Sequence, residues 1–362
     1  MVVLGASFTN QIKVTARGQV RAASRPCLWL GHLLGAKPEP WLLFQVPGII
    51  LNAYQILRLS QARESSPQSV VSPFMDGPLM IDSGGYNLIK NPACPITTKD
   101  LVEVYRTVDA DIVVSLDIPP HPGLSTSETQ ARWKKTKKNA FELSRILDDR
   151  KVMPVVHGYS EDSLRRNSRE IRDLVEDSGM IGLGGLVPLF KLRLVRALQL
   201  VSFLRREYPD KLLHVFGAGS VSTMLILTQM GVDSMDTIGW RIKAAYGAIQ
   251  LPGQSDRFVS PKLDSPKCRR GLSPQETALL GKCECPVCRG QSLKERLKRM
   301  DNSVSFTFNN RAIHNCWVFT QELMTAQRAK AKGTLQELLE ERMSRGYWAH
   351  ALRSLRESAC IA

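Results

Sequence analysis

The chain has 362 residues, of which 43% are hydrophobic and 23% charged, so it can form a large core and is not an intrinsically disordered protein. Its net charge of +15 favours a polyanionic partner, although a merely soluble basic protein remains an alternative. No apolar run reaches the roughly 18 residues of a membrane span, and the N-terminal stretch with Lys13, Arg17 and Arg21 lacks the apolar segment of a signal peptide. We therefore expect a cytoplasmic protein with no membrane partner.

Short apolar runs alternate with helical patterns along most of the chain. We expect Trp41–Ile50 to supply a first strand and Leu51–Arg63 a helix. The later predicted strands end at glycine or a polar residue: Leu79–Ile81, Ile112–Leu116, Val152–Val156, Met180–Leu183, Leu212–Phe216 and Val232–Asp236. The predicted helices between them are Lys99–Thr107, Thr126–Leu147, Ser163–Asp177, Arg193–Glu207 and Ser222–Met230. This alternation implies a parallel sheet of the α/β class, and at least six such units favour a barrel over an open sheet.

The composition changes to Pro, Ser, Asp and Lys between Pro252 and Arg270, which marks an excursion from the barrel. Basic helices are predicted beyond it at Leu293–Met300, Ala312–Lys330 and Thr334–Ser358. We divide the chain into an N-terminal region joining the barrel (1–70), a catalytic barrel core (71–260), a zinc-binding subdomain (261–330) and a C-terminal helical segment (331–362).

A cysteine cluster carries the strongest metal signal. Cys283, Cys285 and Cys288 offer three thiolates within six residues, and His314 follows 26 residues after Cys288. Three sulfurs and one imidazole make a closed tetrahedral site, so we expect a structural Zn²⁺ that fixes the helix of His314 to the cysteine loop. The alternative is a chance cluster of reduced cysteines. The other five cysteines are scattered: Cys27, Cys94, Cys268, Cys316 and Cys360.

Three carboxylates, Asp82, Asp117 and Asp236, stand at or near predicted strand ends. In a barrel those ends converge on one mouth, where all three acids could face one substrate. Displacement at a glycosidic carbon needs one carboxylate as nucleophile and another to manage the proton of the leaving or entering group. For any single aspartate, a capping or salt-bridge role remains the alternative.

Two glycine turns follow other predicted strands, Gly184-Gly185 and Gly217-Ala218-Gly219. The second imitates part of a dinucleotide-binding fingerprint, which leaves a nucleotide-cofactor enzyme as an alternative. Its third glycine is replaced by Ser222, and no ribose-binding acid is evident.

These residues together resemble the tRNA-guanine transglycosylase superfamily over about residues 70–330. The carrying motifs are Asp-Ser-Gly-Gly-Tyr at 82–86, Leu-Gly-Gly-Leu at 183–186, Gly-Val-Asp-Ser-Met-Asp at 231–236 and the three cysteines with His314. The resemblance implies a (β/α)8 TIM barrel with an inserted zinc-binding subdomain. It also implies an enzyme, a pentosyltransferase that exchanges guanine for a 7-deazaguanine.

The resemblance also implies roles for individual residues. Asp236 would be the nucleophile that forms a covalent aspartyl-glycosyl intermediate, and Asp82 the general acid/base. Asp117 and the Gly184-Gly185 backbone would bind the base, and the rings of Tyr86 and Phe216 would sandwich it. His157 stands where the family has glutamine, which leaves its hydrogen bond to the base in doubt.

The segment after Asp236 departs from the tRNA enzymes, and no tRNA-holding C-terminal domain is visible. These departures resemble the DpdA-type branch, of bacteria and phages, which inserts 7-deazaguanines into DNA. We therefore expect guanine in DNA to be replaced, with 7-cyano-7-deazaguanine as the expected base and helper proteins or a homodimer as further partners. Two alternatives stay open: an enzyme of the same kind acting on tRNA, and a non-catalytic zinc-stapled nucleic-acid-binding protein.

Several basic or aromatic residues are candidates for contact with the nucleic acid. Trp240 is expected to fill the gap left by an extruded nucleotide, although a core position is about equally expected. The predicted contacts are Trp240, Arg241, Lys243, Lys294, Arg296, Lys298 and Arg299. A second basic run around Trp133 comprises Arg132, Lys134, Lys135, Lys137 and Lys138, for which a solvated helix face is the alternative.

Overall fold

The computed structural model describes residues 13–14, 20–21, 27–74, 76–86, 96–254, 256–260, 270–301, 305–344, 346–357 and 360. Cys94 and Cys268, and most of the excursion between 252 and 270, lie outside the described residues.

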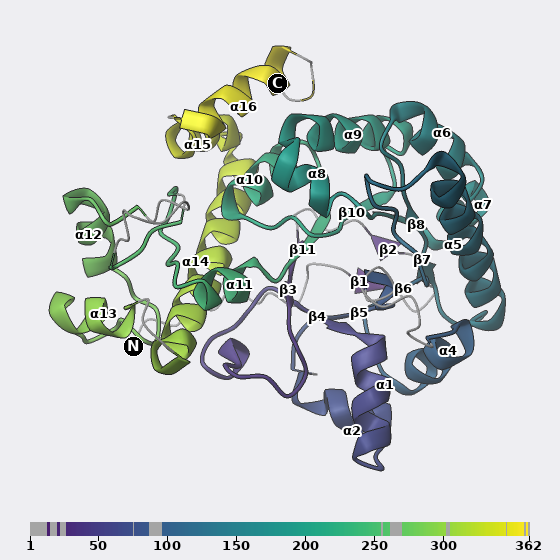
Figure 1. The fold of residues 1–362 in the computed structure, drawn as a ribbon, viewed down its shortest axis with the longest axis horizontal. Coiled ribbons are helices and arrows are strands. Elements are labelled where there is room, and N and C mark those ends of the chain that lie inside the picture. Colours follow the sequence, from purple (N-terminus) through teal and green to yellow (C-terminus); the bar gives the residue numbers. More distant parts are fainter. Residues whose placement is uncertain are drawn as a thin grey trace.

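A parallel sheet closes into a barrel, as predicted (Figure 1). Its strands are β3 (Cys27–Gly31), β4 (Ile49–Asn52), β5 (Leu79–Asp82), β6 (Ile112–Val114), β7 (Val152–Met153), β8 (Val155–Val156), β9 (Met180–Leu183), β10 (Leu212–Val215) and β11 (Ser234–Thr237). The spatial order is β7-β6-β5-β4-β3-β11-β10-β9-β8, and every neighbouring pair is parallel. Only Pro154, which has no N–H to donate, separates β7 from β8, and its carbonyl accepts a hydrogen bond from Gly182 N at 2.9 Å. The two short strands are thus halves of one, and the barrel has the eightfold (β/α) arrangement.

The strands are buried on both faces because helices cover the outside and side chains fill the inside. In β3, Cys27 and Trp29 join an inner cluster with Met80 and Met153. Leu28 and Leu30 point the other way and join the larger cluster between the sheet and the helices. This strand corrects one expectation: β3, and not Trp41–Ile50, is the first barrel strand. A strand of five residues that is apolar on both faces shows no alternation and is easily missed in a sequence.

Helices lie around the barrel, most of them within the ranges that the sequence pattern predicts, whereas three short ones (Pro67–Val71, Val187–Leu192 and Gly239–Ala245) were not predicted. The helices are α1 (Ala53–Ala62), α2 (Pro67–Val71), α4 (Thr98–Thr107), α5 (Thr126–Ile146), α6 (Glu161–Arg169), α7 (Arg172–Ser178), α8 (Val187–Leu192), α9 (Leu194–Glu207), α10 (Val221–Gln229) and α11 (Gly239–Ala245). Side chains of Thr97, Ser125 and Ser160 form capping boxes that begin α4, α5 and α6. The helix expected over 163–177 is two helices, since α6 ends at Arg169 and α7 begins at Arg172.

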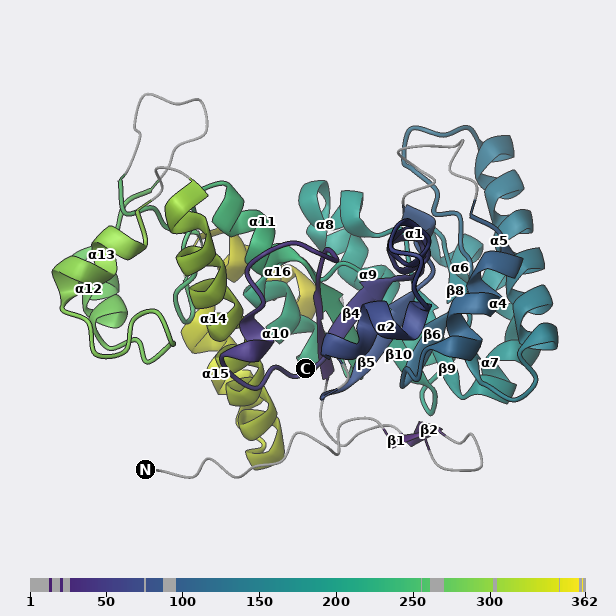
Figure 2. The ribbon, with the colours of Figure 1, turned by 90° about the horizontal axis from the view of Figure 1, so that it is seen from below.

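A smaller lobe follows α11 and lies beside the barrel (Figure 2). It contains α12 (Pro274–Gly281) and α13 (Leu293–Arg299), which pack with the long helix α14 (Ser305–Lys332) around a core of their own. Helix α14 also packs against α10, α11 and β3, so it joins the lobe to the barrel. The expected terminal helix is two helices, α15 (Leu335–Arg342) and α16 (Gly346–Glu357), which pack on α10 and α9.

The antiparallel pair β1 (Lys13–Val14) and β2 (Val20–Arg21) lies beyond the barrel end opposite α8 (Figure 2). Strands β3 and β4 show that part of the first 70 residues completes the barrel. The exact domain boundaries given above stay predictions. Within the part of the chain described, no helix combines the length and apolarity needed to span a bilayer.

Candidate active site and metal centre

The three predicted aspartates meet at the C-terminal mouth of the barrel. Asp82 is the last residue of β5, Asp117 follows β6, and Asp236 is the penultimate residue of β11. The charges of Asp117 and Asp236 both act on Asp82, so the three carboxylates share one electrostatic environment. Strands β5 and β11, which have β4 and β3 between them in the sheet, thus supply acids to one site.

Asp82 is poised to exchange a proton near neutral pH. Burial is the main cause that raises its pKa from 3.8 to about 7, and the charges of Asp117 and then Asp236 add to the effect. The Gly84 N–H opposes it by donating to Asp82 Oδ2 at 3.0 Å. Gly84 adopts φ +87°, a conformation that favours glycine, and a Cβ there would approach Asn52 Oδ1 to 2.8 Å. A carboxyl group tuned in this way suits a general acid/base.

Asp117 is buried and fixed through both of its oxygens. Ser83 Oγ donates to Oδ1 at 3.3 Å, and His157 Nε2 lies 2.8 Å from Oδ2. Because the carboxylate oxygen can only accept, His157 carries its proton on Nε2. His157 therefore orients Asp117, a role that the sequence did not predict, and its Nε2 is not available for the base. Each Asp117 oxygen keeps a further lone pair, so the carboxylate can still accept from N–H groups of a base.

The two oxygens of Asp236 have different surroundings. Oδ1 accepts a hydrogen bond from Gly217 N at 2.8 Å, and His214 Nε2 lies 3.4 Å from the same atom. Among the described residues, Oδ2 receives no hydrogen bond. The protein thus holds the carboxylate through Oδ1, and Oδ2 is free to react.

The glycine turns let the backbone come close to the carboxylates. A Cβ on Gly85 would lie 2.2 Å from both the carbonyl oxygen and Oδ1 of Asp117, and one on Gly184 would lie 2.9 Å from His157 Nε2. Tyr159 Oη donates to the carbonyls of Pro120 at 2.9 Å and Gly185 at 3.2 Å, which ties two mouth loops together. No side chain larger than hydrogen fits at Gly85 or Gly184 without a shift.

The two rings expected to sandwich the base lie on different elements. Phe216 follows β10, and its ring packs over Gly182, where a Cβ would come within 2.8 Å of Phe216 Cε2. Tyr86 is 48% exposed and directly precedes residues that are not described. Their role in stacking stays a prediction.

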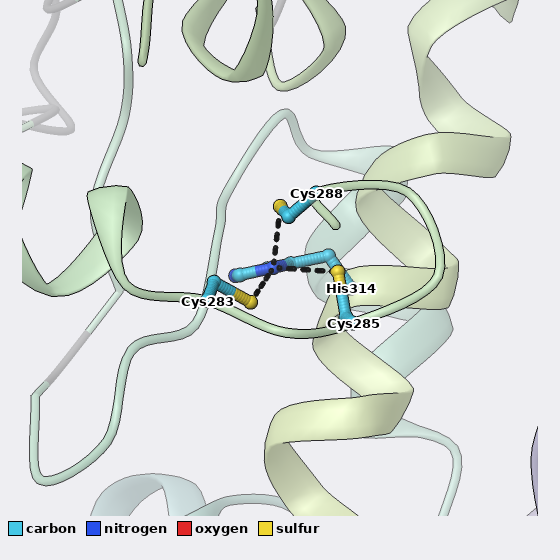
Figure 3. Close-up of side chains that lie close together, drawn as sticks. All are labelled: Cys283, Cys285, Cys288 and His314. Carbon is cyan, nitrogen blue, oxygen red and sulfur yellow. Dashed lines mark hydrogen bonds between the residues drawn. The ribbon is translucent and has the colours of Figure 1, made fainter. Parts of the chain in front are cut away.

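The metal ligands predicted from the sequence converge in the lobe (Figure 3). The sulfurs of Cys283, Cys285 and Cys288 lie 3.5, 3.6 and 3.8 Å from His314 Nδ1. These separations are close to the edge of a tetrahedron around Zn²⁺ with Zn–S of about 2.3 Å and Zn–N of about 2.0 Å. His314 Nε2 lies 2.8 Å from the carbonyl oxygen of Gln250, which leaves Nδ1 unprotonated and able to bind a metal. The donor set therefore fits a metal ion such as zinc.

Several residues expected to contact nucleic acid have structural partners instead. Trp240 is fully buried, and its indole N–H donates to Gly31 O at 3.2 Å, which corrects the expectation that it fills a gap in the nucleic acid. Arg296 is buried and donates to the carbonyls of Leu280 at 3.0 Å and Cys283 at 2.8 Å, so it supports the metal loop. Trp240 is the second residue of α11, and burial of its apolar ring is favourable once the indole N–H has an acceptor. The Arg296 guanidinium also donates to Gln291 O at 2.9 Å, and these three carbonyl acceptors offset the cost of burying its charge.

Of the other residues expected to contact nucleic acid, some have partners within the protein and some are exposed. Arg241 donates to Lys37 O at 2.6 Å, and Lys243 pairs with Asp256. Arg299 donates to Val287 O at 3.2 Å. Lys294 and Lys298 are exposed on α13 and stay available for phosphate contacts.

The basic run on α5 lines a hollow beside the mouth. Lys134 and Lys137 line it together with His157, Tyr159 and residues of α6, and it encloses about 500 Å³. Lys137 pairs with Glu170 at 2.7 Å, and Arg132 donates to Pro119 O at 2.7 Å. These lysines therefore line a hollow that is shared with His157, the partner of Asp117.

Comparison with known proteins agrees with this geometry. Residues 42–347 match the family described as queuine tRNA-ribosyltransferase. The tRNA-guanine(15) transglycosylase of Archaeoglobus fulgidus is 28% identical over 85% of this chain and 60% of its own length. That of Thermococcus kodakarensis is 26% identical over 81% of this chain and 48% of its own length. The chain thus spans about half the length of the relatives it matches. By this match and by its barrel, the chain belongs to the queuine tRNA-ribosyltransferase family.

Proposed function

We propose that the protein exchanges a guanine base in a nucleic acid for another base of the guanine or 7-deazaguanine type. The observation that carries this is the meeting of Asp82, Asp117 and Asp236 at one barrel mouth, with the pKa of Asp82 raised to about 7. A pair of carboxylates in different environments suits nucleophilic displacement at a glycosidic carbon. The reported family supports this assignment.

In the first half of the reaction, Asp236 Oδ2 attacks C1′ of the target nucleotide. The C1′–N9 bond breaks, its electron pair goes to the departing base, and Asp82 in its protonated form supplies a proton. The result is a glycosyl ester on Asp236. A carboxyl with a pKa of about 7 is partly protonated at neutral pH, which this step requires.

In the second half, the incoming base gives a proton to Asp82 and attacks C1′. The ester bond breaks and its electron pair returns to Asp236. Asp117 would accept hydrogen bonds from N–H groups of either base, held for that purpose by Ser83 and His157. The metal, bound by Cys283, Cys285, Cys288 and His314, would stabilise the lobe and take no part in these steps.

We propose tRNA as the polymer. The similar proteins are named tRNA-guanine(15) transglycosylases, which supports tRNA. Two residues after Asp236 that were expected to contact DNA, Trp240 and Arg241, donate to carbonyls within the protein instead. DNA becomes the competing outcome of the test.

The test supplies radiolabelled guanine to the purified protein with either total tRNA or duplex DNA and measures label in the recovered polymer. Guanine is the probe because exchange of guanine for itself does not depend on the identity of the 7-substituent. We expect label in tRNA and none in DNA, and a protein–tRNA adduct that survives denaturation and maps to Asp236.

Asp236→Asn is the matched variant, since it keeps the shape of the side chain but removes the anion. It should bind tRNA, form no adduct and incorporate no label. Label in DNA alone would overturn the choice of tRNA, whereas full activity of Asp236→Asn would overturn the mechanism. Repeating the assay with 7-cyano-7-deazaguanine as competitor tests the incoming base.

A further inference from the structure

Behind Asp236 lies a buried row of polar side chains on three adjacent strands. Trp29 belongs to β3, Ser234 to β11 and His214 to β10. All three are fully buried. Trp29 Nε1 lies 2.8 Å from Ser234 Oγ, and Ser234 Oγ lies 2.8 Å from His214 Nδ1. The row ends at Asp236, whose Oδ1 is 3.4 Å from His214 Nε2.

The indole donor at one end and the carboxylate at the other together fix the direction of the row. An indole N–H can only donate, so Ser234 Oγ accepts from Trp29. The single hydroxyl proton of Ser234 is then free to donate to His214 Nδ1. A neutral imidazole whose Nδ1 accepts carries its proton on Nε2, and this N–H faces the carboxylate of Asp236. The opposite tautomer would set a lone pair of Nε2 against the negative carboxylate.

Within the described residues, His214 Nε2 forms no hydrogen bond in this arrangement. A buried donor without a partner is costly, and 3.4 Å from Asp236 Oδ1 is only slightly longer than a hydrogen bond. Such contacts commonly shorten when a substrate binds. Gly217 N already holds the same oxygen at 2.8 Å, so both donors act on Oδ1 and neither on Oδ2.

We propose that His214 is a positioning residue for Asp236, and that Trp29 and Ser234 set its tautomer. This rests on the proposed function, in which Asp236 is the nucleophile. With Gly217 N bonded to Oδ1 and His214 Nε2–H facing the same oxygen, Oδ2 is turned to C1′ and becomes the ester oxygen. When the incoming base breaks the ester, the electron pair returns to the carboxylate, and the donors on Oδ1 stabilise that charge.

The experiment compares His214→Leu, which cannot donate, with His214→Gln, whose amide can. Rates of adduct formation and breakdown are measured in single turnovers with tRNA, and kcat and KM for guanine in the steady state. His214→Leu should slow both half-reactions about ten- to hundredfold, the usual effect of losing a hydrogen bond to a charged group. KM should change little, and His214→Gln should recover to within a few-fold of the wild type.

Ser234→Ala tests the row without touching His214, and it should slow exchange several-fold. Its matched control is Ser115→Ala, another fully buried serine, whose Oγ accepts from Val155 N at 3.3 Å and which is not part of the row. The control should exchange at the wild-type rate.

His214 also contacts Phe216 edge-to-face with ring centroids 4.2 Å apart. A purely structural role through that ring would raise KM for the base and would not be rescued by His214→Gln. That result would overturn the inference, as would wild-type rates for His214→Leu and Ser234→Ala with the adduct still on Asp236. A wild-type protein that forms no adduct on Asp236 would instead refute the proposed function.

Discussion

Replacing Asp82 by asparagine is expected to stabilise the folded protein above neutral pH while abolishing base exchange. Burial and the charges of Asp117 and Asp236 raise the pKa of Asp82 from 3.8 to about 7, so the folded protein holds this proton more tightly than the unfolded chain. As the pH rises from about 4 to 7, the unfolded state releases the proton first, and the wild type loses stability. Below about pH 4, Asp82 is protonated in both the folded and the unfolded state, so it does not change the stability with pH.

The size of the effect follows from the shift. About three pKa units correspond to about 4 kcal/mol, at roughly 1.4 kcal/mol per unit. Asp82 is partly exposed, and solvent screening lowers this figure, so we expect Asp82→Asn to be more stable than the wild type by about 1–3 kcal/mol at pH 8. At pH 5 most of this advantage should be absent.

The assay is urea unfolding followed by circular dichroism at pH 5 and pH 8, with zinc in excess. The quantity compared is the difference in unfolding free energy between Asp82→Asn and the wild type at each pH. Protonation of the metal ligands at low pH affects both proteins equally and cancels in this difference. Asp109→Asn is the control, since the Asp109 side chain is 91% exposed, and it should show no such difference. An Asp82→Asn protein that is less stable at pH 8, or that follows the wild type at both pH values, would refute the reasoning.

Two further predictions concern the lobe and the mouth. Cys285→Ala should lose bound zinc and several kcal/mol of stability together, because metal binding and folding are coupled, whereas Cys316→Ala, also buried, should keep its zinc by metal analysis. Retention of zinc by Cys285→Ala would contradict the ligand set. Gly85→Ala should reduce exchange at least a hundredfold, because its Cβ would lie 2.2 Å from Asp117 Oδ1, and a misplacement of about 1 Å costs that much. Base exchange measured with labelled guanine checks this. Normal activity of Gly85→Ala would show that exchange of the base does not depend on the placement of Asp117.

The sequence alone determined the barrel, because alternating strands and helices leave few other ways to bury strands that are apolar on both faces. It also predicted the cluster of three cysteines and His314, and the three carboxylates, that the structure brings together. Close spacing brings Cys283, Cys285 and Cys288 together, and the ends of parallel strands necessarily share one edge. These are consequences of local pattern and of topology, which a single sequence carries.

Only the tertiary structure decided how these groups are held. The donors on Asp236 come from β10 and its following turn, and nothing in the sequence near His214 indicates that its ring reaches a carboxylate on the next strand. The sequence left in doubt whether His157 bonds to the base, and in the structure its Nε2 lies 2.8 Å from Asp117 Oδ2. Arg296 was predicted to contact nucleic acid and is buried, and Trp240, for which a core position was about equally expected, lies in the core. Burial and hydrogen bonding depend on what packs around a side chain and not on its type alone. Sequence names the chemical groups of this protein, and only packing between distant segments determines which atoms of those groups are free to react.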